Sequence, residues 1–324
     1  MKLDLPVFED VLAAAKRLEG MAVKTPVMES LWLNDIVGGR VFIKPECLQR
    51  TGSFKFRGAW NFISQLDRKS NPGGVVAFSS GNHAQGVAAA AAIQNLPTLI
   101  VMPADSPAIK IANTKALGAE IVTYDRVSED RQEVAKHHLA ARNAVLVPPF
   151  DHKFIMAGQG TVALELVDWA QENQLTFDQL LVPTGGGGLV GGSALVFTEK
   201  LPEAEIFSVE PEKFDDYRRS LIAGKVVANE ATTGSICDAI MTPSPGTLTF
   251  AVNQTRLTKG LVVDDNQVRQ AMRFAFERLK LVVEPGGAVA LAAILNGKID
   301  CKGRNTAIIL SGGNVDPDLF ASVL

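Results

Sequence analysis

Cysteine is scarce in this chain of 324 residues: Cys47, Cys237 and Cys301 lie far apart, with no Cys-x-x-Cys pair. This scarcity excludes a disulfide scaffold and a cysteine-rich zinc module, and it is typical of a reducing compartment. No apolar run is long enough to predict a membrane-spanning helix. The first segment, MKLDLPVFEDVLAAAKRLEG, has interspersed acidic residues and no apolar stretch typical of a signal peptide. We therefore expect a cytoplasmic protein.

An excess of charge of either sign is also missing. The chain has 32 Lys and Arg against 35 Asp and Glu, which gives a net charge of −3 at pH 7. This balance argues against a binding surface for nucleic acid or for an anionic membrane. Aromatic residues make up only 6% of the chain, whereas glycine occurs 28 times, so the positions of the glycines become informative.

Short apolar runs alternate with helical patterns along most of the chain. The first series predicts strands over 74–79, 98–103, 120–124 and 144–148, and helices over 83–94, 107–118 and 128–143, the last with Ser128 as its N-cap. The second series predicts strands over 179–184, 205–210 and 306–311, and helices near 189–200, 265–279 and 286–296. A helix over 8–18 and an extended stretch over 40–46 precede both series, and 211–264 is expected to form long functional loops.

Apolar strands that alternate with helices indicate parallel sheets covered on both faces. We predict an α/β protein with two domains, each built on a parallel-rich twisted sheet covered by helices. The large domain would comprise residues 1–68 and 149–324, and residues 69–148 would form a small inserted domain. A cleft between the two is the expected ligand site.

Four consecutive glycines, Gly185, Gly186, Gly187 and Gly188, stand after an apolar strand and before a predicted helix. Backbone N–H groups at the positive end of a helix favour a phosphate group. The run has neither the Walker A pattern nor the GxGxxG spacing, so a small monophosphate fits better than a nucleotide. The alternative is a turn that only permits close packing.

Lys55 is flanked by Phe54 and Phe56. Apolar surroundings lower the pKa of a lysine and make its amine nucleophilic, as Schiff-base chemistry requires. The alternative is an exposed lysine at the start of an amphipathic helix.

Three further segments place polar residues at the end of a strand or the start of a helix. In Ser79-Ser80-Gly81-Asn82-His83, hydroxyl, amide and unpaired N–H groups suit a carboxylate or a phenolic oxygen, or they only cap a helix. Ser311 follows the last strand, where its hydroxyl can bond a ring nitrogen or belong to a plain turn. Glu284 precedes Pro285, where a carboxylate also favours the positive end of a helix.

In this order and spacing, the segments KPECLQRTGSFKFRG, SSGNHAQG, AGQGT, PTGGGG, EP and SGGN resemble the fold type II pyridoxal-phosphate (PLP) enzymes. Within these enzymes the chain is similar to the group of serine/threonine dehydratases, serine racemases and 3-hydroxyaspartate dehydratases. The resemblance extends over nearly the whole chain. It implies a fold like that of the tryptophan synthase β chain, an amino acid substrate and a homodimer.

The resemblance also implies roles for individual residues. Lys55 would bind PLP covalently, Asn82 would hydrogen-bond the phenolic oxygen of the ring, and Ser311 would contact the pyridine nitrogen. The other implied residues are Gly185, Gly186, Gly187 and Gly188 around the phosphate with Leu189 at their end, Phe54 and Glu284 beside the cofactor, and Ser79, Ser80, Asn82 and His83 at the substrate carboxylate.

The implied reaction converts a β-hydroxy amino acid (3-hydroxyaspartate, serine or threonine) to a 2-oxo acid and ammonia, with Lys55 taking the Cα proton. Ser80 stands where racemases of the group carry serine, so a serine or aspartate racemase is the alternative, with Ser80 delivering a proton to Cα. A PLP-bearing or ligand-sensing protein without turnover is a third hypothesis. It is opposed by the fact that none of the residues that the reaction would need is missing.

Arg131 lies in the first turn of the predicted helix 128–143, where a cation opposes the helix dipole. The resemblance implies that it faces a dicarboxylate ligand. A guanidinium binds a second carboxylate bidentately, which favours 3-hydroxyaspartate over threonine. The alternative is a surface arginine paired with Glu129 or Glu133.

Glu210, the carbonyl of Phe214 and Asp216 follow the spacing of the divalent-cation site in serine racemases and related dehydratases. Oxygen ligands alone favour Mg²⁺, Mn²⁺ or Ca²⁺ over zinc. The alternative is an acidic surface turn, because Asp215 adjoins. Ala239 departs from the family, where glycine is frequent.

Overall fold

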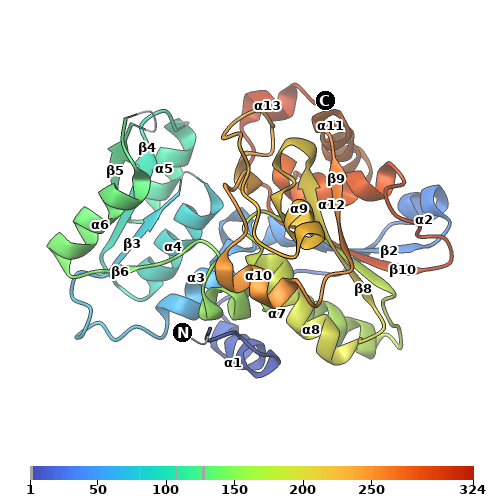
Figure 1. The fold of residues 1–324 in the computed structure, drawn as a ribbon, viewed down its shortest axis with the longest axis horizontal. Helices are drawn as coiled ribbons and strands as arrows, with labels where there is room; N and C mark the ends of the chain where they lie inside the picture. Colours follow the sequence, from blue (N-terminus) through green and yellow to red (C-terminus); the bar gives the residue numbers. More distant parts are fainter. Residues whose placement is uncertain (1–2, 80, 107, 126–127) are drawn as a thin grey trace.

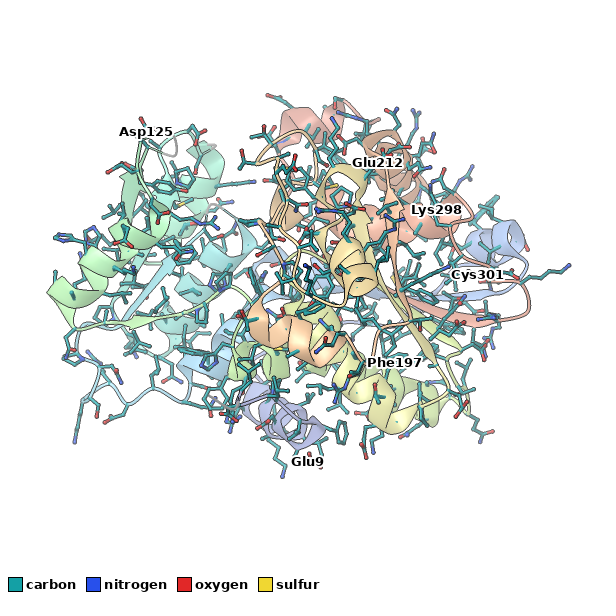
Figure 2. All side chains as sticks on the ribbon, in the orientation of Figure 1. Glu9, Asp125, Phe197, Glu212, Lys298 and Cys301 are labelled. Carbon is teal, nitrogen blue, oxygen red and sulfur yellow. The ribbon has the colours of Figure 1, made fainter. Side chains whose placement is uncertain are left out.

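The computed structural model describes residues 3–79, 81–106, 108–125 and 128–324, which contain two separate sheets. Figure 1 shows the smaller sheet on one side of the molecule, with α4, α5 and α6, and the larger sheet on the other. Charged side chains such as those of Glu9 and Lys298 are exposed, whereas Phe197 is buried (Figure 2). The predicted α/β class with parallel-rich sheets is confirmed.

The larger sheet, within the described residues, has six strands in the order β1-β2-β10-β7-β8-β9. All neighbours are parallel except β1 and β2. The strands are β1 (Met28–Glu29), β2 (Arg40–Pro45), β7 (Gln179–Pro183), β8 (Glu205–Pro211), β9 (Lys259–Val263) and β10 (Asn305–Leu310). The smaller sheet has the order β5-β4-β3-β6 and is parallel throughout, with β3 (Val75–Phe78), β4 (Thr98–Pro103), β5 (Glu120–Tyr124) and β6 (Val145–Leu146).

Helices cover both sheets. Those that follow strands of the smaller sheet are α4 (Asn82–Ile93), α5 (Ala108–Ala116) and α6 (Arg131–Arg142). The others are α1 (Phe8–Leu18), α2 (Leu31–Val37), α3 (Lys55–Ile63), α7 (Lys153–Glu172), α8 (Gly188–Lys200), α9 (Asp216–Ala223), α10 (Thr247–Asn253), α11 (Asp265–Phe274), α12 (Pro285–Leu295) and α13 (Pro317–Ala321). Short 3-10 turns are η1 (Glu46–Leu48), η2 (Arg50–Gly52), η3 (Glu212–Phe214) and η4 (Asp238–Ile240), and the π turn η5 (Ala275–Leu279) continues α11.

Alternation of apolar side chains places a separate core on each face of the larger sheet. In β7, Leu180 and Val182 pack on the face covered by α1, α7 and α8, whereas Leu181 packs with α11 and α12. In β10, Ala307 and Ile309 pack in the same core as Leu180 and Val182. Because successive side chains of a strand point to opposite faces, an apolar run without interruption is what a doubly covered sheet requires.

Helix α3 lies where the two halves of the molecule meet. Its Phe56, Trp60 and Ile63 share a core with Val75 and Ala77 of the smaller sheet, and it also packs against α7. The residue that opens α3 is Lys55. The strands of the smaller sheet fall between residues 75 and 146, while the division into domains at 68/69 and 148/149 stays a prediction.

Two local predictions differ from the structure. Helix α6 begins at Arg131, and its N-cap is Asp130, whose carboxylate accepts hydrogen bonds from Gln132 N and Glu133 N; Ser128 is therefore not the cap. The region 211–264 contains α9, α10 and β9 as well as loops. The first backbone N–H groups of α10 donate hydrogen bonds to Asp151, which is distant in sequence. The residues around 247 therefore do not show where this helix begins.

None of the helices found in the described residues has both the length and the apolar composition that crossing a membrane requires.

Candidate active site

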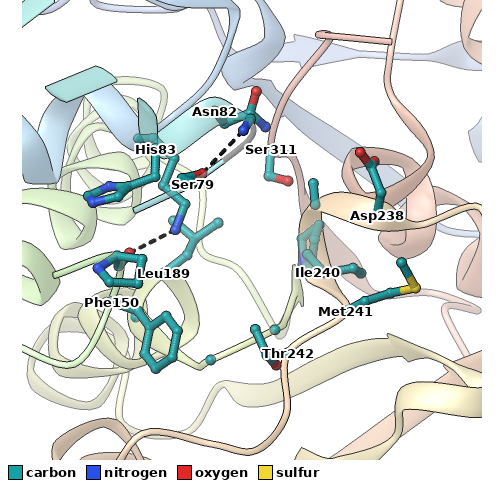
Figure 3. A pocket seen from close by; sticks show the side chains of 18 of the residues that line it. Ser79, Asn82, His83, Phe150, Leu189, Asp238, Ile240, Met241, Thr242 and Ser311 are labelled. Atoms are coloured by element: carbon teal, nitrogen blue, oxygen red, sulfur yellow. Dashed lines mark hydrogen bonds between the residues drawn. The ribbon is translucent and has the colours of Figure 1, made fainter. Parts of the chain in front are cut away.

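One cavity lies between the two sheets, and side chains from both line it (Figure 3). It brings together nearly all the residues predicted to bind cofactor or substrate. These are Phe54, Lys55, Ser79, Asn82, His83, Arg131, Gly185, Gly186, Gly187, Gly188, Leu189, Glu284 and Ser311. Ser80 lies outside the described residues. Glu210, Phe214 and Asp216 do not line the cavity.

The amine of Lys55 is held inside this cavity. Its Nζ donates a hydrogen bond to the carbonyl oxygen of Pro149 at 2.8 Å and lies 5.2 Å from the centre of the Phe54 ring. Burial lowers the pKa of Lys55 to about 8, although the carboxyl of Glu284 opposes the shift. At pH 7 a larger fraction of this amine is therefore neutral than for an exposed lysine, and a neutral amine is nucleophilic and basic.

The glycine run forms a tight cradle between β7 and α8. Gly187 has φ +91°, and a Cβ there would lie 2.3 Å from the hydroxyl of Tyr217. A Cβ on Gly186 would lie 2.4 Å from the ring of Phe150. Helix α8 has no side-chain cap, so its first N–H groups remain available to an anion. The geometry leaves room for a small anion, and binding of a phosphate group here stays a prediction.

A chain of amides joins Asn82 to its neighbours in the cavity. Asn82 Nδ2 donates to Glu284 Oε1 at 2.5 Å, and Asn314 Nδ2 donates to Asn82 Oδ1 at 2.7 Å. Burial, together with the charge of Asp238, raises the pKa of Glu284 to about 8, although the bond from Asn82 opposes the shift. The two hydrogen bonds, one donated and one accepted, fix the orientation of the Asn82 amide.

The turn before α4 supplies backbone N–H groups rather than a side-chain cap. Its N-cap is Gly81, whose N–H donates to Ser79 Oγ at 3.2 Å. The ring of His83 bonds the carbonyl oxygen of Val147 through Nε2 at 2.9 Å. Burial, and next the charge of Lys55, lower the pKa of His83 to about 3. The imidazole is thus neutral, and His83 offers a ligand its backbone N–H.

Three charged residues stand at the rim of the cavity. The guanidinium of Arg131 lies 5.3 Å from the centre of the Phe78 ring. Among the described residues it has no ion pair with Glu129 or Glu133; Glu133 pairs instead with Lys136. Lys110 and Asp238 join the two halves of the molecule through a 2.7 Å ion pair between α5 and η4.

The residues predicted to bind a divalent cation lie outside the cavity. Glu210 and Asp216 are fully buried, and Asp216 Oδ2 has no hydrogen-bond partner in the described structure. Both Glu210 oxygens accept backbone N–H groups from the start of α9, at 2.8 Å. Burial and the charge of Asp216 raise the pKa of Glu210. The described residues contain no group of three His, Cys, Asp or Glu side chains arranged to hold a metal. Glu210 and Asp216 would supply only two side-chain ligands.

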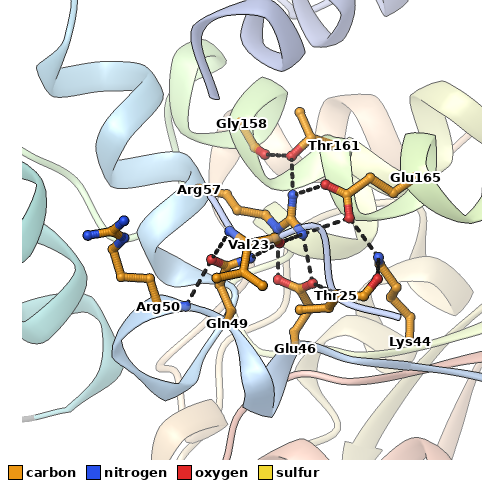
Figure 4. A network of polar contacts seen from close by, with 10 residues as sticks. All are labelled: Val23, Thr25, Lys44, Glu46, Gln49, Arg50, Arg57, Gly158, Thr161 and Glu165. Carbon is orange, nitrogen blue, oxygen red and sulfur yellow. Dashed lines mark hydrogen bonds and ion pairs between the residues drawn. The ribbon is translucent and has the colours of Figure 1, made fainter. Parts of the chain in front are cut away.

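A buried network of ionic contacts supports the first turn of α3 (Figure 4). Arg57 binds Glu46 through two hydrogen bonds of 2.7 and 2.8 Å, and it also binds Glu165 of α7. Glu165 receives a further bond from the buried Lys44 at 2.6 Å. Burial raises the pKa of Glu46, but the charge and hydrogen bonds of Arg57, with smaller contributions from Lys44 and Thr25, together hold it below its usual value. Two cations and two anions therefore fasten α3, two residues after Lys55, to β2 and α7.

Several residues of the cavity have no role assigned from the sequence, among them Pro149, Lys110, Asp238 and Gln159. The Pro149 carbonyl and the Lys110–Asp238 pair depend on contacts between distant segments, which no local pattern reveals. Gln159 lies within AGQGT, a segment already noticed for its resemblance, and its side chain is fully buried in the cavity wall.

Comparison with known proteins matches residues 18–312 to the family of pyridoxal-phosphate dependent enzymes. The L-threo-3-hydroxyaspartate ammonia-lyase of Pseudomonas sp. is 44% identical and is covered over 99% of both chains. The serine racemase of Schizosaccharomyces pombe is 40% identical over 99% of this chain and 98% of its own. The crystal structure of a T.th. threonine deaminase has a TM-score of 0.90 at 40% identity, over 96% of this chain and 99% of the other.

These matches extend over the cradle, the lysine segment and both sheets, and they confirm the resemblance to fold type II enzymes. The chain belongs to the family of pyridoxal-phosphate dependent enzymes.

Proposed function

We propose that this chain is an ammonia-lyase that dehydrates and deaminates a β-hydroxy amino acid, with 3-hydroxyaspartate as the first candidate and serine and threonine as the others. The observation that carries the proposal is a single cavity with the amine of Lys55 inside it and the guanidinium of Arg131 on its rim. Relatives named for the same reaction on L-threo-3-hydroxyaspartate support it.

The residues of the cavity fit PLP. The glycine run leaves no room for side chains and turns the start of α8 toward the cavity, as a phosphate monoester requires. Lys55 offers an amine, Asn82 an oriented amide and Ser311 a hydroxyl. When bound, PLP supplies an electron sink for the electrons left at Cα.

The start of α4 would bind the substrate, and Lys55 would act as the base. The N–H groups that follow Gly81 would bind the α-carboxylate at the positive end of the helix. Lys55 Nζ, with its lowered pKa, would accept the Cα proton. Hydroxide leaves Cβ and takes up a proton to become water. The released enamine tautomerises to an imine, which takes up water to give the 2-oxo acid and ammonia.

Arg131 would bind the second carboxylate of 3-hydroxyaspartate. We expect Arg131→Ala to lower kcat/KM for 3-hydroxyaspartate about 10- to 100-fold, the loss expected for a charge-assisted hydrogen bond, and to change that for serine by less than about threefold. Arg142→Ala, on the same helix but in a surface pair with Glu120, is the control. Equal losses on both substrates would reject this role.

Racemisation of serine or aspartate is the second candidate, because serine racemases are among the relatives at 40% identity. It would return the proton to the opposite face of Cα, and the resemblance to racemases implies that Ser80 would be the donor. Appearance of the D-enantiomer without an equivalent amount of 2-oxo acid would favour it over the lyase.

Glu210, Asp216 and the Phe214 carbonyl would bind Mg²⁺, Mn²⁺ or Ca²⁺. Two adjacent buried carboxylates, one with an unpartnered oxygen, suit a hard divalent cation, which would relieve their repulsion. The role of this ion would be structural, because the site lies behind the glycine cradle: Tyr217, next to Asp216, packs against Gly187.

Metal removal tests that proposal. We expect EDTA to lower the melting temperature, and Mg²⁺ at about 100 times its Kd to restore about 2.7 kcal/mol of stability. Asp216→Asn should abolish the response, whereas Asp215→Asn, whose native carboxylate pairs with Arg218 and Arg219, should retain it. If EDTA changes neither the melting temperature nor the activity, the protein does not bind a divalent cation at this site.

Assembly as a homodimer and a cytoplasmic location stay predictions from the sequence. Sedimentation velocity of the purified protein would test the first, with a monomeric species as the contrary result.

A further inference from the structure

Gln159 of α7 is a buried amide without partners. Its side chain is 1% exposed, and neither Nε2 nor Oε1 has a hydrogen-bond partner in the described structure. An unmade hydrogen bond is costly in a protein interior, so two on one side chain require an explanation. Folding alone does not give one, because an apolar side chain of similar size would fill the same space.

The position of Gln159 points to a ligand. The residue belongs to the wall of the cavity, and a Cβ built on Gly188 would lie 2.4 Å from its Oε1. Gly188 is the first residue of α8, whose start carries free N–H groups and no side-chain cap. The amide therefore lies beside the anion cradle, at the place where a polar group of the ligand would complete its hydrogen bonds.

Lys55 does not satisfy the amide, because its Nζ donates to Pro149 instead. Gln159 and Lys55 face the cavity from different helices, α7 and α3. An amide has a donor at one end and an acceptor at the other, and a half-turn exchanges them within the same space. It can thus present an N–H to an anion in the cradle.

We propose that Gln159 is a binding residue for the phosphate of the cofactor, with an amide N–H donating to a phosphate oxygen next to Gly188. This inference rests on the cofactor site of the proposed function and adds a side-chain donor to the backbone N–H groups of the cradle. Gln159 would therefore contribute to cofactor affinity and to nothing that the protein needs in the absence of cofactor.

Two substitutions separate these effects. Gln159→Met keeps the length of the side chain and removes its polar atoms, so PLP should bind about 10- to 100-fold more weakly. The cofactor-free protein should melt at an unchanged or higher temperature, because no unpartnered group remains. Gln159→Glu places a negative charge beside the phosphate and should weaken binding further. Ser193→Ala is the control: Ser193 is another buried, unpartnered group, on α8 but outside the cavity lining.

The test titrates cofactor-free protein with PLP and, separately, with pyridoxal, which lacks the phosphate. The expected result is a loss of affinity in Gln159→Met for PLP only, with Ser193→Ala equal to wild type for both ligands. An equal loss for both ligands, PLP affinity within twofold of wild type, or a lower melting temperature of the cofactor-free variant would each overturn the inference. Wild-type protein that binds neither ligand would instead refute the cofactor site itself.

Discussion

Replacement of Lys55 by alanine is expected to remove covalent cofactor binding and to lower kcat by at least about 1000-fold, since one side chain supplies both the attachment point and the base. PLP-loaded wild-type protein should absorb near the edge of the visible range, and borohydride should remove this band. The variant should lack the band while retaining the fold, because Lys55 has a single hydrogen bond, to Pro149, within the described residues.

Lys153→Ala is the matched control for this loss, because Lys153 is a surface lysine that pairs with Asp4. It should leave the band and the activity intact. Retention of a borohydride-sensitive band in Lys55→Ala would show that another amine binds the cofactor, and the assignment of Lys55 would then be wrong.

Removal of one charge from the network beneath α3 is expected to cause the largest loss of stability. Glu46→Gln leaves the fully buried Arg57 without half of its counter-charge, and breaking a buried pair costs about 3 to 5 kcal/mol. Urea unfolding should show this as a lower midpoint. Because Arg57 lies two residues after Lys55, the folded variant should also bind PLP less tightly.

The structure contains a control with the same geometry. Glu29 also binds an arginine, Arg40, through two hydrogen bonds of 2.8 Å, but this pair is exposed. Glu29→Gln should cost less than about 1 kcal/mol. Equal losses in the two variants would mean that burial does not govern the energy of these pairs, and the stabilising role of the buried network would then be wrong.

Local sequence patterns revealed the strands and the cradle because both depend on neighbouring residues. Leu180, Leu181 and Val182 pack alternately into the two cores of a sheet covered on both faces. An uninterrupted apolar run in the sequence therefore predicts such a strand. The glycine run is equally local, since close packing excludes a Cβ at successive positions. Pattern and resemblance together therefore singled out a glycine run and a lysine that line the same cavity.

The features that were missed depend on contacts between distant segments. Asp151 provides hydrogen-bond acceptors for the start of α10, and the Lys110–Asp238 pair joins helices from the two halves of the molecule. Helix α7, which is buried on nearly every side, shows little of the alternation between apolar and polar residues that predicts a surface helix. The lack of partners for Gln159 is likewise a property of the folded chain alone.

The most direct test of the proposed lyase activity is a balance of products. PLP-loaded protein would be incubated with L-threo-3-hydroxyaspartate and, in parallel, with L-serine, while ammonia, 2-oxo acid and the D-enantiomer are measured together. We predict equal amounts of ammonia and 2-oxo acid, with 3-hydroxyaspartate consumed faster. Accumulation of the D-enantiomer with no matching 2-oxo acid, or no turnover of either substrate by protein that carries the cofactor, would contradict this prediction.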